Sequence, residues 1–106
     1  MAEDILSQLY ERILDRKDAS SDESYSARLL AGGPVLAGRK LSEEATETLI
    51  AAIQETPEAL TKEAADLLYH LLVLLVSRGV TLDSVFAELR SREAQSGLAE
   101  KASRSS

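Results

Sequence analysis

The segment from Leu67 to Val76, LLYHLLVLLV, is the longest apolar run in this 106-residue chain and limits the folds that the chain can adopt. Its ten residues are too few to cross a bilayer, so we expect a helix buried inside a protein. Only Pro34 and Pro57 interrupt a sequence rich in Ala, Leu and Glu, and no segment shows the alternation typical of a strand. The sequence therefore predicts an all-α protein.

Boundary signals divide the chain into helices. Thr56 and Pro57 are typical of an N-cap and a first helical position, Gly79 is typical of the residue that follows a helix, and Thr81 can cap a further helix. The expected helices are Asp4–Arg16, a short piece at Ser26–Leu30, a second helix starting between Pro34 and Ser42 and ending near Gln54, a third helix from Pro57 to Arg78, and a fourth after Thr81. If the second helix begins late, Ser42 is its N-cap.

The domain organisation follows from these helices. We expect one domain over residues 1–90, a bundle of four to five helices around a central antiparallel helix hairpin. Residues 91–106 are rich in Ser, Glu and Ala and offer little to bury, so we expect a frayed or disordered tail. A domain of this size buries a small core and gains stability from a partner subunit.

Composition and charge exclude several classes of function. The chain contains no cysteine, which rules out disulfides and thiolate metal sites. Its net charge of −6 argues against binding to nucleic-acid backbones. The N-terminal stretch MAEDILSQLYERIL is acidic and amphipathic, unlike a signal peptide. We therefore expect a cytoplasmic protein with neither a nucleic-acid nor a membrane partner.

Two pairs of carboxylates should face each other across the predicted hairpin. Glu44 and Glu47 are spaced i, i+3 on one helix, as are Glu63 and Asp66 on the next, so each pair lies on one helix face. Glu47 and Glu63 are each eight positions from residue 55, at the centre of the turn, and Glu44 and Asp66 are each eleven positions from it. Residues equally far from the turn lie at the same level of an antiparallel hairpin, so the four carboxylates should meet.

Four facing carboxylates repel one another and raise one another's pKa values unless a cation lies between them. Mg²⁺, with Mn²⁺ as an alternative, prefers oxygen ligands and commonly shares its coordination shell with substrate phosphates. Glu43 is a further ligand, an outer carboxylate or a base that positions water. Glutamates near the start of a helix are commonly solvated and complement its dipole, but Asp66 adjoins the apolar run, where an unpaired charge is costly. The two pairs together favour a metal site.

The motifs Glu43-Glu44-x-x-Glu47 and Glu63-x-x-Asp66, within LSEEATETLIAA and EAADLLYHLLVLL, resemble those of the phosphoribosyl-ATP pyrophosphohydrolase family. This family belongs to the all-α nucleotide pyrophosphohydrolases of MazG type. The similarity extends from Leu9 to about Arg90, although relatives often carry Val-Gly where this chain has Leu41-Ser42. The resemblance implies Mg²⁺-dependent hydrolysis of phosphoribosyl-ATP to phosphoribosyl-AMP and pyrophosphate in histidine biosynthesis. It also implies a homodimer whose helices complete the bundle.

Residue roles combine the carboxylate pattern with this resemblance. Glu44, Glu47, Glu63 and Asp66 are the expected metal ligands, and either Glu43 or Glu47 should orient the attacking water. The anionic substrate requires cations, and Lys40, one turn before Glu44, is the strongest candidate. The remaining candidate substrate-binding residues are Arg16, Lys17, Tyr25, Arg28 and His70. Surface Lys and Arg can instead offset nearby acids, and a lone histidine in an apolar helix is commonly a hydrogen-bonded core residue.

Two other functions remain open at this point. A MazG-type house-cleaning enzyme that hydrolyses non-standard nucleoside triphosphates would use the same metal ligands. A non-catalytic helical dimerisation module would leave the acids solvated. A di-iron carboxylate bundle is disfavoured because it needs Glu-x-x-His pairs, whereas the sequence contains a single histidine, His70.

Overall fold

A computed structural model describes residues 2–19 and 24–105, and the surroundings of side chains for residues 5–19 and 24–95. This described part contains five α-helices and no strand, which confirms the all-α class. The helices are α1 (Ala2–Asp15), α2 (Tyr25–Ala31), α3 (Gly33–Gln54), α4 (Pro57–Ser77) and α5 (Leu82–Ser105).

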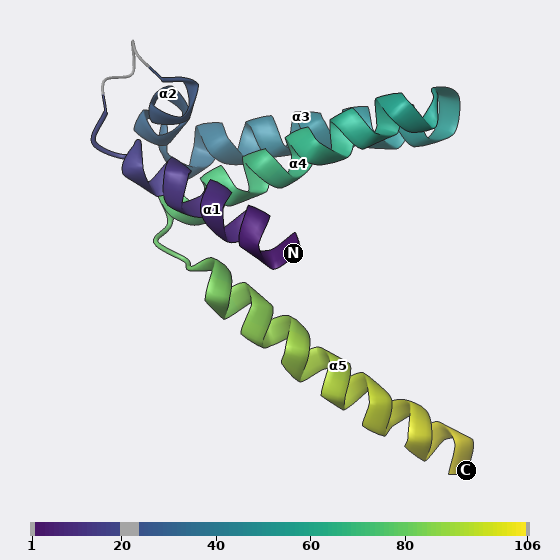
Figure 1. Cartoon of the computed structure of the whole chain (residues 1–106). Coiled ribbons are helices and arrows are strands. Elements are labelled where there is room, and N and C mark those ends of the chain that lie inside the picture. Colours follow the sequence, from purple (N-terminus) through teal and green to yellow (C-terminus); the bar gives the residue numbers. More distant parts are fainter. Residues whose placement is uncertain (1, 20–23, 106) are drawn as a thin grey trace.

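Helices α3 and α4 form the central antiparallel hairpin and run side by side along most of their length (Figure 1). The Thr56 hydroxyl accepts a hydrogen bond from the Ala59 amide at 3.1 Å, and Pro57 occupies the first turn of α4. Ala37 and Ala51 on α3 are almost fully buried, so the two helices approach closely over small side chains. The predicted hairpin and its turn are therefore present.

The start of α3 settles which of the two expected positions is correct. Gly33 has a φ of +71°, a left-handed conformation that glycine adopts without strain, and Pro34 follows in the first turn of the helix. Ser42 therefore lies inside α3, where its carbonyl accepts from the Thr46 hydroxyl at 3.1 Å. Of the range of starts that the sequence left open, the early one is observed, because glycine and proline supply the entry to the helix, and Ser42 is not an N-cap.

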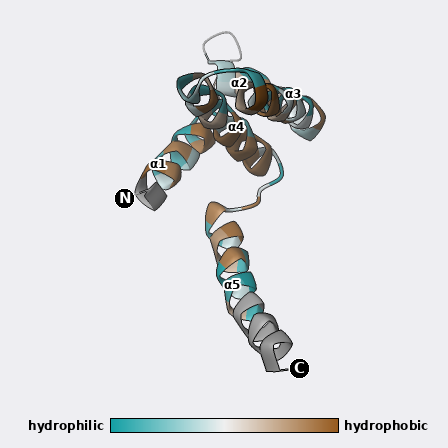
Figure 2. Ribbon diagram, turned by 90° about the vertical axis from the view of Figure 1, so that its right-hand side faces the viewer, coloured by the Kyte–Doolittle hydropathy of each residue, from teal (hydrophilic) through white to brown (hydrophobic). Residues whose placement is uncertain are grey.

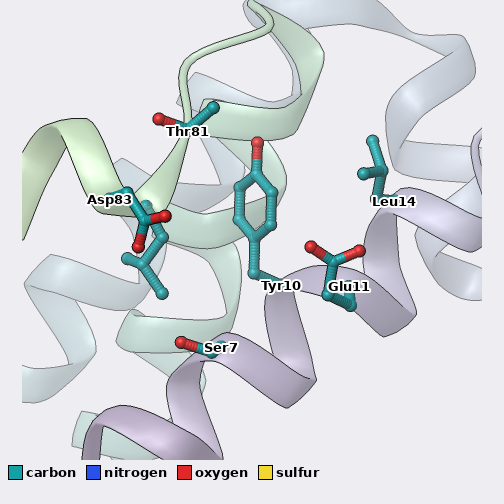
Figure 3. Close-up of a pocket in the computed structure, with 7 residues that line it drawn as sticks. Ser7, Tyr10, Glu11, Leu14, Thr81 and Asp83 are labelled. Carbon is teal, nitrogen blue, oxygen red and sulfur yellow. The ribbon is translucent and has the colours of Figure 1, made fainter.

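The core lies where α1 crosses α4. Ile13 on α1 and Leu72, Val73 and Val76 on α4 are almost fully buried. The Tyr10 hydroxyl donates to the Val80 carbonyl at 2.8 Å, which attaches α1 to the turn after α4. Figure 3 shows Tyr10 in the middle of a cavity lined by α1 and by the segment that leads into α5. This cavity contains none of the predicted site residues.

Helix α5 begins at the predicted position and then extends away from the other helices (Figure 1). The Thr81 hydroxyl accepts from the Ser84 amide at 3.1 Å, and Leu82 is buried in the core. The helix continues to Ser105, and side chains 91–95 are exposed. A segment without buried side chains gains no packing energy to hold it in place, so fraying beyond Ser91 stays a prediction.

In the described part of the chain, no helix taken singly has the length and apolar character needed to cross a membrane. The bent pair formed by Pro57–Ser77 and Leu82–Gln95, at 111° to each other, meets the same criteria of length and composition when the two are taken together.

Candidate functional site

The hairpin brings three of the four predicted metal ligands into one group. Carboxylate oxygens of Glu44 from α3 and of Glu63 and Asp66 from α4 all lie within 4.8 Å of one another. Glu44 and Glu63 are half-buried, whereas Asp66 is exposed. Glu47 is exposed beside this group, and its charge acts on both Glu44 and Glu63. The sequence spacing thus predicted which side chains converge.

Burial and neighbouring negative charges make Glu44 and Glu63 harder to ionise. Burial, followed by the negative charge of Glu47, raises the pKa of Glu44 above its usual value of 4.5. The same two causes raise the pKa of Glu63, and Asp66 adds to them. Negative charge on Glu44 and Glu63 is therefore unfavourable near neutral pH unless a proton or a cation compensates.

The donor set suits a hard divalent cation. One oxygen of Glu44, Oε2, is buried and has no hydrogen-bond partner among the described residues. A buried carboxylate oxygen without a partner is costly, so a ligand that completes its coordination would be stabilising. Every atom offered by Glu44, Glu63 and Asp66 is a carboxylate oxygen, which favours Mg²⁺ or Mn²⁺ over softer metals.

Tyr25, the first residue of α2, and His70 on α4 form one edge of the site. The Nδ1 atom of buried His70 lies 2.7 Å from the Asp66 backbone carbonyl, which can only accept, so Nδ1 is the donor. In the neutral ring Nε2 then accepts from the Tyr25 hydroxyl, at 3.1 Å. His70 is therefore a buried, hydrogen-bonded residue, as is common for a lone histidine in an apolar helix. Its bond goes to the Asp66 backbone, because a side chain at i+4 on a helix reaches the carbonyl of residue i.

A second hydrogen bond joins α2 to α4 beside this pair. Ser26 and Tyr69 are hydrogen-bonded through their hydroxyl groups. The rings of Tyr25 and Tyr69 are stacked, with centroids 6.2 Å apart, and each meets the His70 ring edge-on. Burial and then the charge of Glu44 raise the pKa of Tyr25, which places its ring near the carboxylates. The acidic group therefore has an aromatic wall on one side.

The predicted cations are distributed unevenly around the site. Lys40 forms an ion pair at 3.7 Å with Glu43, the residue that precedes Glu44 in α3. Arg28 lies near Tyr25, where its charge opposes the rise in the pKa of that hydroxyl caused by burial and by Glu44. Arg16 and Lys17 are exposed in the turn after α1, and Lys17 lines a separate cavity with Leu30 and Ser77.

Sequence reasoning missed Thr48 on α3. Its hydroxyl contacts the backbone carbonyls of Glu44 at 2.7 Å and Glu63 at 3.2 Å. The i+4 spacing from Glu44 predicts the first contact, but the second depends on the distance between two helices, for which the sequence carries no signal.

The raised pKa values predict how the stability of the metal-free protein depends on pH. Glu44 holds its proton more tightly in the folded chain, so its contribution to the free energy of unfolding is fully present below the ordinary pKa of 4.5 and is lost as the pH rises through the raised value. We expect Glu44→Gln to be more stable than the wild type at about pH 7.5 in EDTA, with a difference that shrinks towards about pH 5. Urea unfolding at several pH values measures this difference. A stability difference between Glu44→Gln and the wild type that does not change with pH would contradict the raised pKa of Glu44.

Comparisons with known proteins give one family model and relatives that share about half of this sequence. The family model described as phosphoribosyl-ATP pyrophosphohydrolase matches residues 6–93. The chain is 52% identical over 99 residues to a phosphoribosyl-ATP pyrophosphatase of Methylobacterium nodulans, covering 93% of this chain and 92% of that protein. It is 54% identical over 99 residues to a protein of the same name from Erythrobacter litoralis, covering 93% and 95% of the two chains.

Proposed function

The chain belongs to the phosphoribosyl-ATP pyrophosphohydrolase family, and we propose that it hydrolyses phosphoribosyl-ATP to phosphoribosyl-AMP and pyrophosphate, an early step of histidine biosynthesis. The observation that carries this proposal is the family match over residues 6–93, which includes every carboxylate of the acidic group. The relatives' names favour this substrate over the non-standard nucleoside triphosphates of a house-cleaning enzyme.

We propose Mg²⁺, with Mn²⁺ as a substitute, as the cofactor. Glu44, Glu63 and Asp66 would hold it, and Glu47 lies close enough to join them. The buried Oε2 of Glu44 supports this assignment, because a cation would supply the partner that this oxygen lacks. When bound, the metal would polarise phosphoryl oxygens and offset the charge that develops on the leaving pyrophosphate.

The chain's own residues would then orient water and substrate. A water oxygen forms a bond to one of the two phosphorus atoms of the α–β anhydride link. That link breaks, and pyrophosphate leaves. A carboxylate must take the proton of the water. Glu47 suits this role because it lies beside Glu44 and Glu63 and is exposed to solvent. Glu43 is the alternative base, but its ion pair with Lys40 favours a role in holding that lysine.

Lys40 and Arg28 are the proposed phosphate contacts, since Lys40 is paired with Glu43, the neighbour of Glu44 in the chain, and Arg28 lies near Tyr25. Tyr25, which is exposed, would contact the ribose or the base from the aromatic edge, and buried His70 would act on the substrate through its hydrogen bond to the Tyr25 hydroxyl. Arg16 and Lys17 keep their proposed role only if the substrate extends towards the turn after α1.

We also propose that the protein is a cytoplasmic homodimer in which hairpins pack together. Several large apolar side chains of α3 and α4 are exposed, which is unfavourable for an isolated small domain. Figure 2 shows apolar residues along both helices of the hairpin. The exposed large apolar residues of the hairpin are Val35, Leu49, Ile50, Ile53, Leu68 and Leu71.

The substrate is tested by measuring kcat/KM for pyrophosphate release from phosphoribosyl-ATP, dATP and dUTP in the presence of Mg²⁺. We expect phosphoribosyl-ATP to be preferred by at least about a hundredfold, because its second phosphoribosyl group supplies binding energy that the simple triphosphates lack. Preference for dATP or dUTP would support the house-cleaning function. No hydrolysis of any of the three would support a non-catalytic module.

A further inference from the structure

Thr48 connects the two helices that carry the carboxylates. It is half-buried on α3, one turn after Glu44. Its hydroxyl oxygen lies 2.7 Å from the Glu44 carbonyl and 3.2 Å from the Glu63 carbonyl on α4. Both carbonyls can only accept, so the single hydroxyl hydrogen is shared between them in a three-centre hydrogen bond. The backbones of two proposed metal ligands are thereby held together.

Other threonines of the hairpin lack this cross-helix contact. Thr46 on α3 donates to the Ser42 carbonyl at 3.1 Å, and Thr61 on α4 donates to the Pro57 carbonyl at 2.9 Å. Both are exposed and bond only within their own helix. Among the threonines that the structure describes, Thr48 is the one whose hydroxyl reaches a neighbouring helix. The i−4 bond is therefore a general property of these threonines, and the second acceptor is specific to Thr48.

The position of this contact determines the distance between ligands. Ala51, the next residue of α3 towards the turn on the same face, is almost fully buried, so small side chains allow the helices to approach closely at this level. A methyl group in place of the hydroxyl would lie 2.7 and 3.2 Å from the two carbonyl oxygens. Carbon–oxygen contacts in proteins are about 3.3–3.6 Å, so the contact to the Glu63 carbonyl on α4 would be too short by about 0.1–0.4 Å and would push the two helices slightly apart.

A small separation of the ligands affects Mg²⁺ more than Ca²⁺. Mg²⁺ requires near-ideal octahedral geometry with oxygen ligands at about 2.0–2.1 Å, whereas Ca²⁺ accepts about 2.3–2.6 Å in flexible arrangements. We infer that Thr48 is a positioning residue that sets the spacing of Glu44 and Glu63 for Mg²⁺ and disfavours Ca²⁺. This inference rests on the proposed metal site and adds an origin for its ion selectivity.

The test is calorimetric titration of Mg²⁺ and of Ca²⁺ into the metal-free full-length chain and its variants. Thr48→Val should weaken Mg²⁺ binding by about tenfold, as loss of a group that supports metal ligands commonly does. Its affinity for Ca²⁺ should change by less than about threefold, because that ion tolerates longer ligand distances. Thr48→Ala removes the hydroxyl without adding a clash and should shift the selectivity in the same direction. Thr48→Ser keeps the hydroxyl and should retain the wild-type selectivity.

Thr46→Val is the matched control, because it removes the same i−4 bond from the same helix without a contact to α4. It should leave both affinities unchanged. Wild-type selectivity in both Thr48→Val and Thr48→Ala, or an equal loss for the two ions, would overturn the positioning role and leave the metal site intact. Absence of Mg²⁺ binding in the wild type would instead overturn the metal site and, with it, the role of Thr48.

Discussion

Replacing Glu44 by glutamine should lower the kcat for pyrophosphate release by about a thousandfold, because a metal ion supplies several kcal/mol of transition-state stabilisation and each ~1.4 kcal/mol corresponds to a factor of ten. Glutamine has the shape of glutamate but lacks the charge that holds a divalent cation. Steady-state assays with phosphoribosyl-ATP and Mg²⁺ measure the effect. Asp66→Asn and Glu47→Ala should also abolish most of the turnover, since Asp66 belongs to the same acidic group and Glu47, beside that group, is the proposed base.

This loss of activity should occur without loss of the fold. In the metal-free protein the charge of Glu44 is unfavourable, because burial and Glu47 raise its pKa, so the glutamine variant should keep its helical circular dichroism. Glu58→Gln is the control, because Glu58 is an exposed acid in the first turn of the same hairpin's second helix. It should retain full activity. Turnover of Glu44→Gln close to that of the wild type would exclude Glu44 as a metal ligand.

The second large effect is expected at the proposed dimer interface. Leu49 and Ile53 are 59% and 71% exposed and lie one helical turn apart on α3. Changing both to lysine removes four apolar side chains from a symmetric interface. At about 1 kcal/mol for each partly buried side chain, the dimer dissociation constant should rise by about a thousandfold. Analytical ultracentrifugation over a range of protein concentrations measures this shift from dimer to monomer.

Ile5→Lys provides the comparison for that double variant. Ile5 is 66% exposed on α1, outside the hairpin, so its replacement should leave the oligomeric state unchanged. A wild-type protein that is monomeric at every concentration would show that the exposed hairpin residues do not form a dimer interface. A dimer that persists in Leu49→Lys/Ile53→Lys would place the interface on another surface.

Local signals were sufficient to predict the helices. Thr56 and Pro57 at the hairpin turn and Gly79 after α4 act through backbone geometry and capping bonds that involve only neighbouring residues. Ser42 left the start of α3 open in the sequence because its side chain suits an N-cap, whereas the helix begins at Gly33 and Pro34. Local rules identify possible helix starts, and the backbone conformation in the folded protein, here the positive φ of Gly33, determines which start is used.

The acidic group was predictable because it depends on two regular spacings. An i, i+3 pair on each helix, together with equal distances from the turn, brings Glu44, Glu63 and Asp66 together. The contacts of Thr48 and the bond between Ser26 and Tyr69 were not predictable in this way. Each depends on how closely two helices pack, which results from the sum of many side-chain contacts and not from a pattern in either helix.

The most direct test of the acidic group as a magnesium site is a calorimetric titration of Mg²⁺ into metal-free wild-type protein and into Glu44→Gln. We expect saturable binding in the wild type, accompanied by a higher melting temperature because the ion binds the folded state, and no such binding or stabilisation in the variant. Equal binding by the two proteins, or no binding by the wild type, would contradict a site built on Glu44, Glu63 and Asp66.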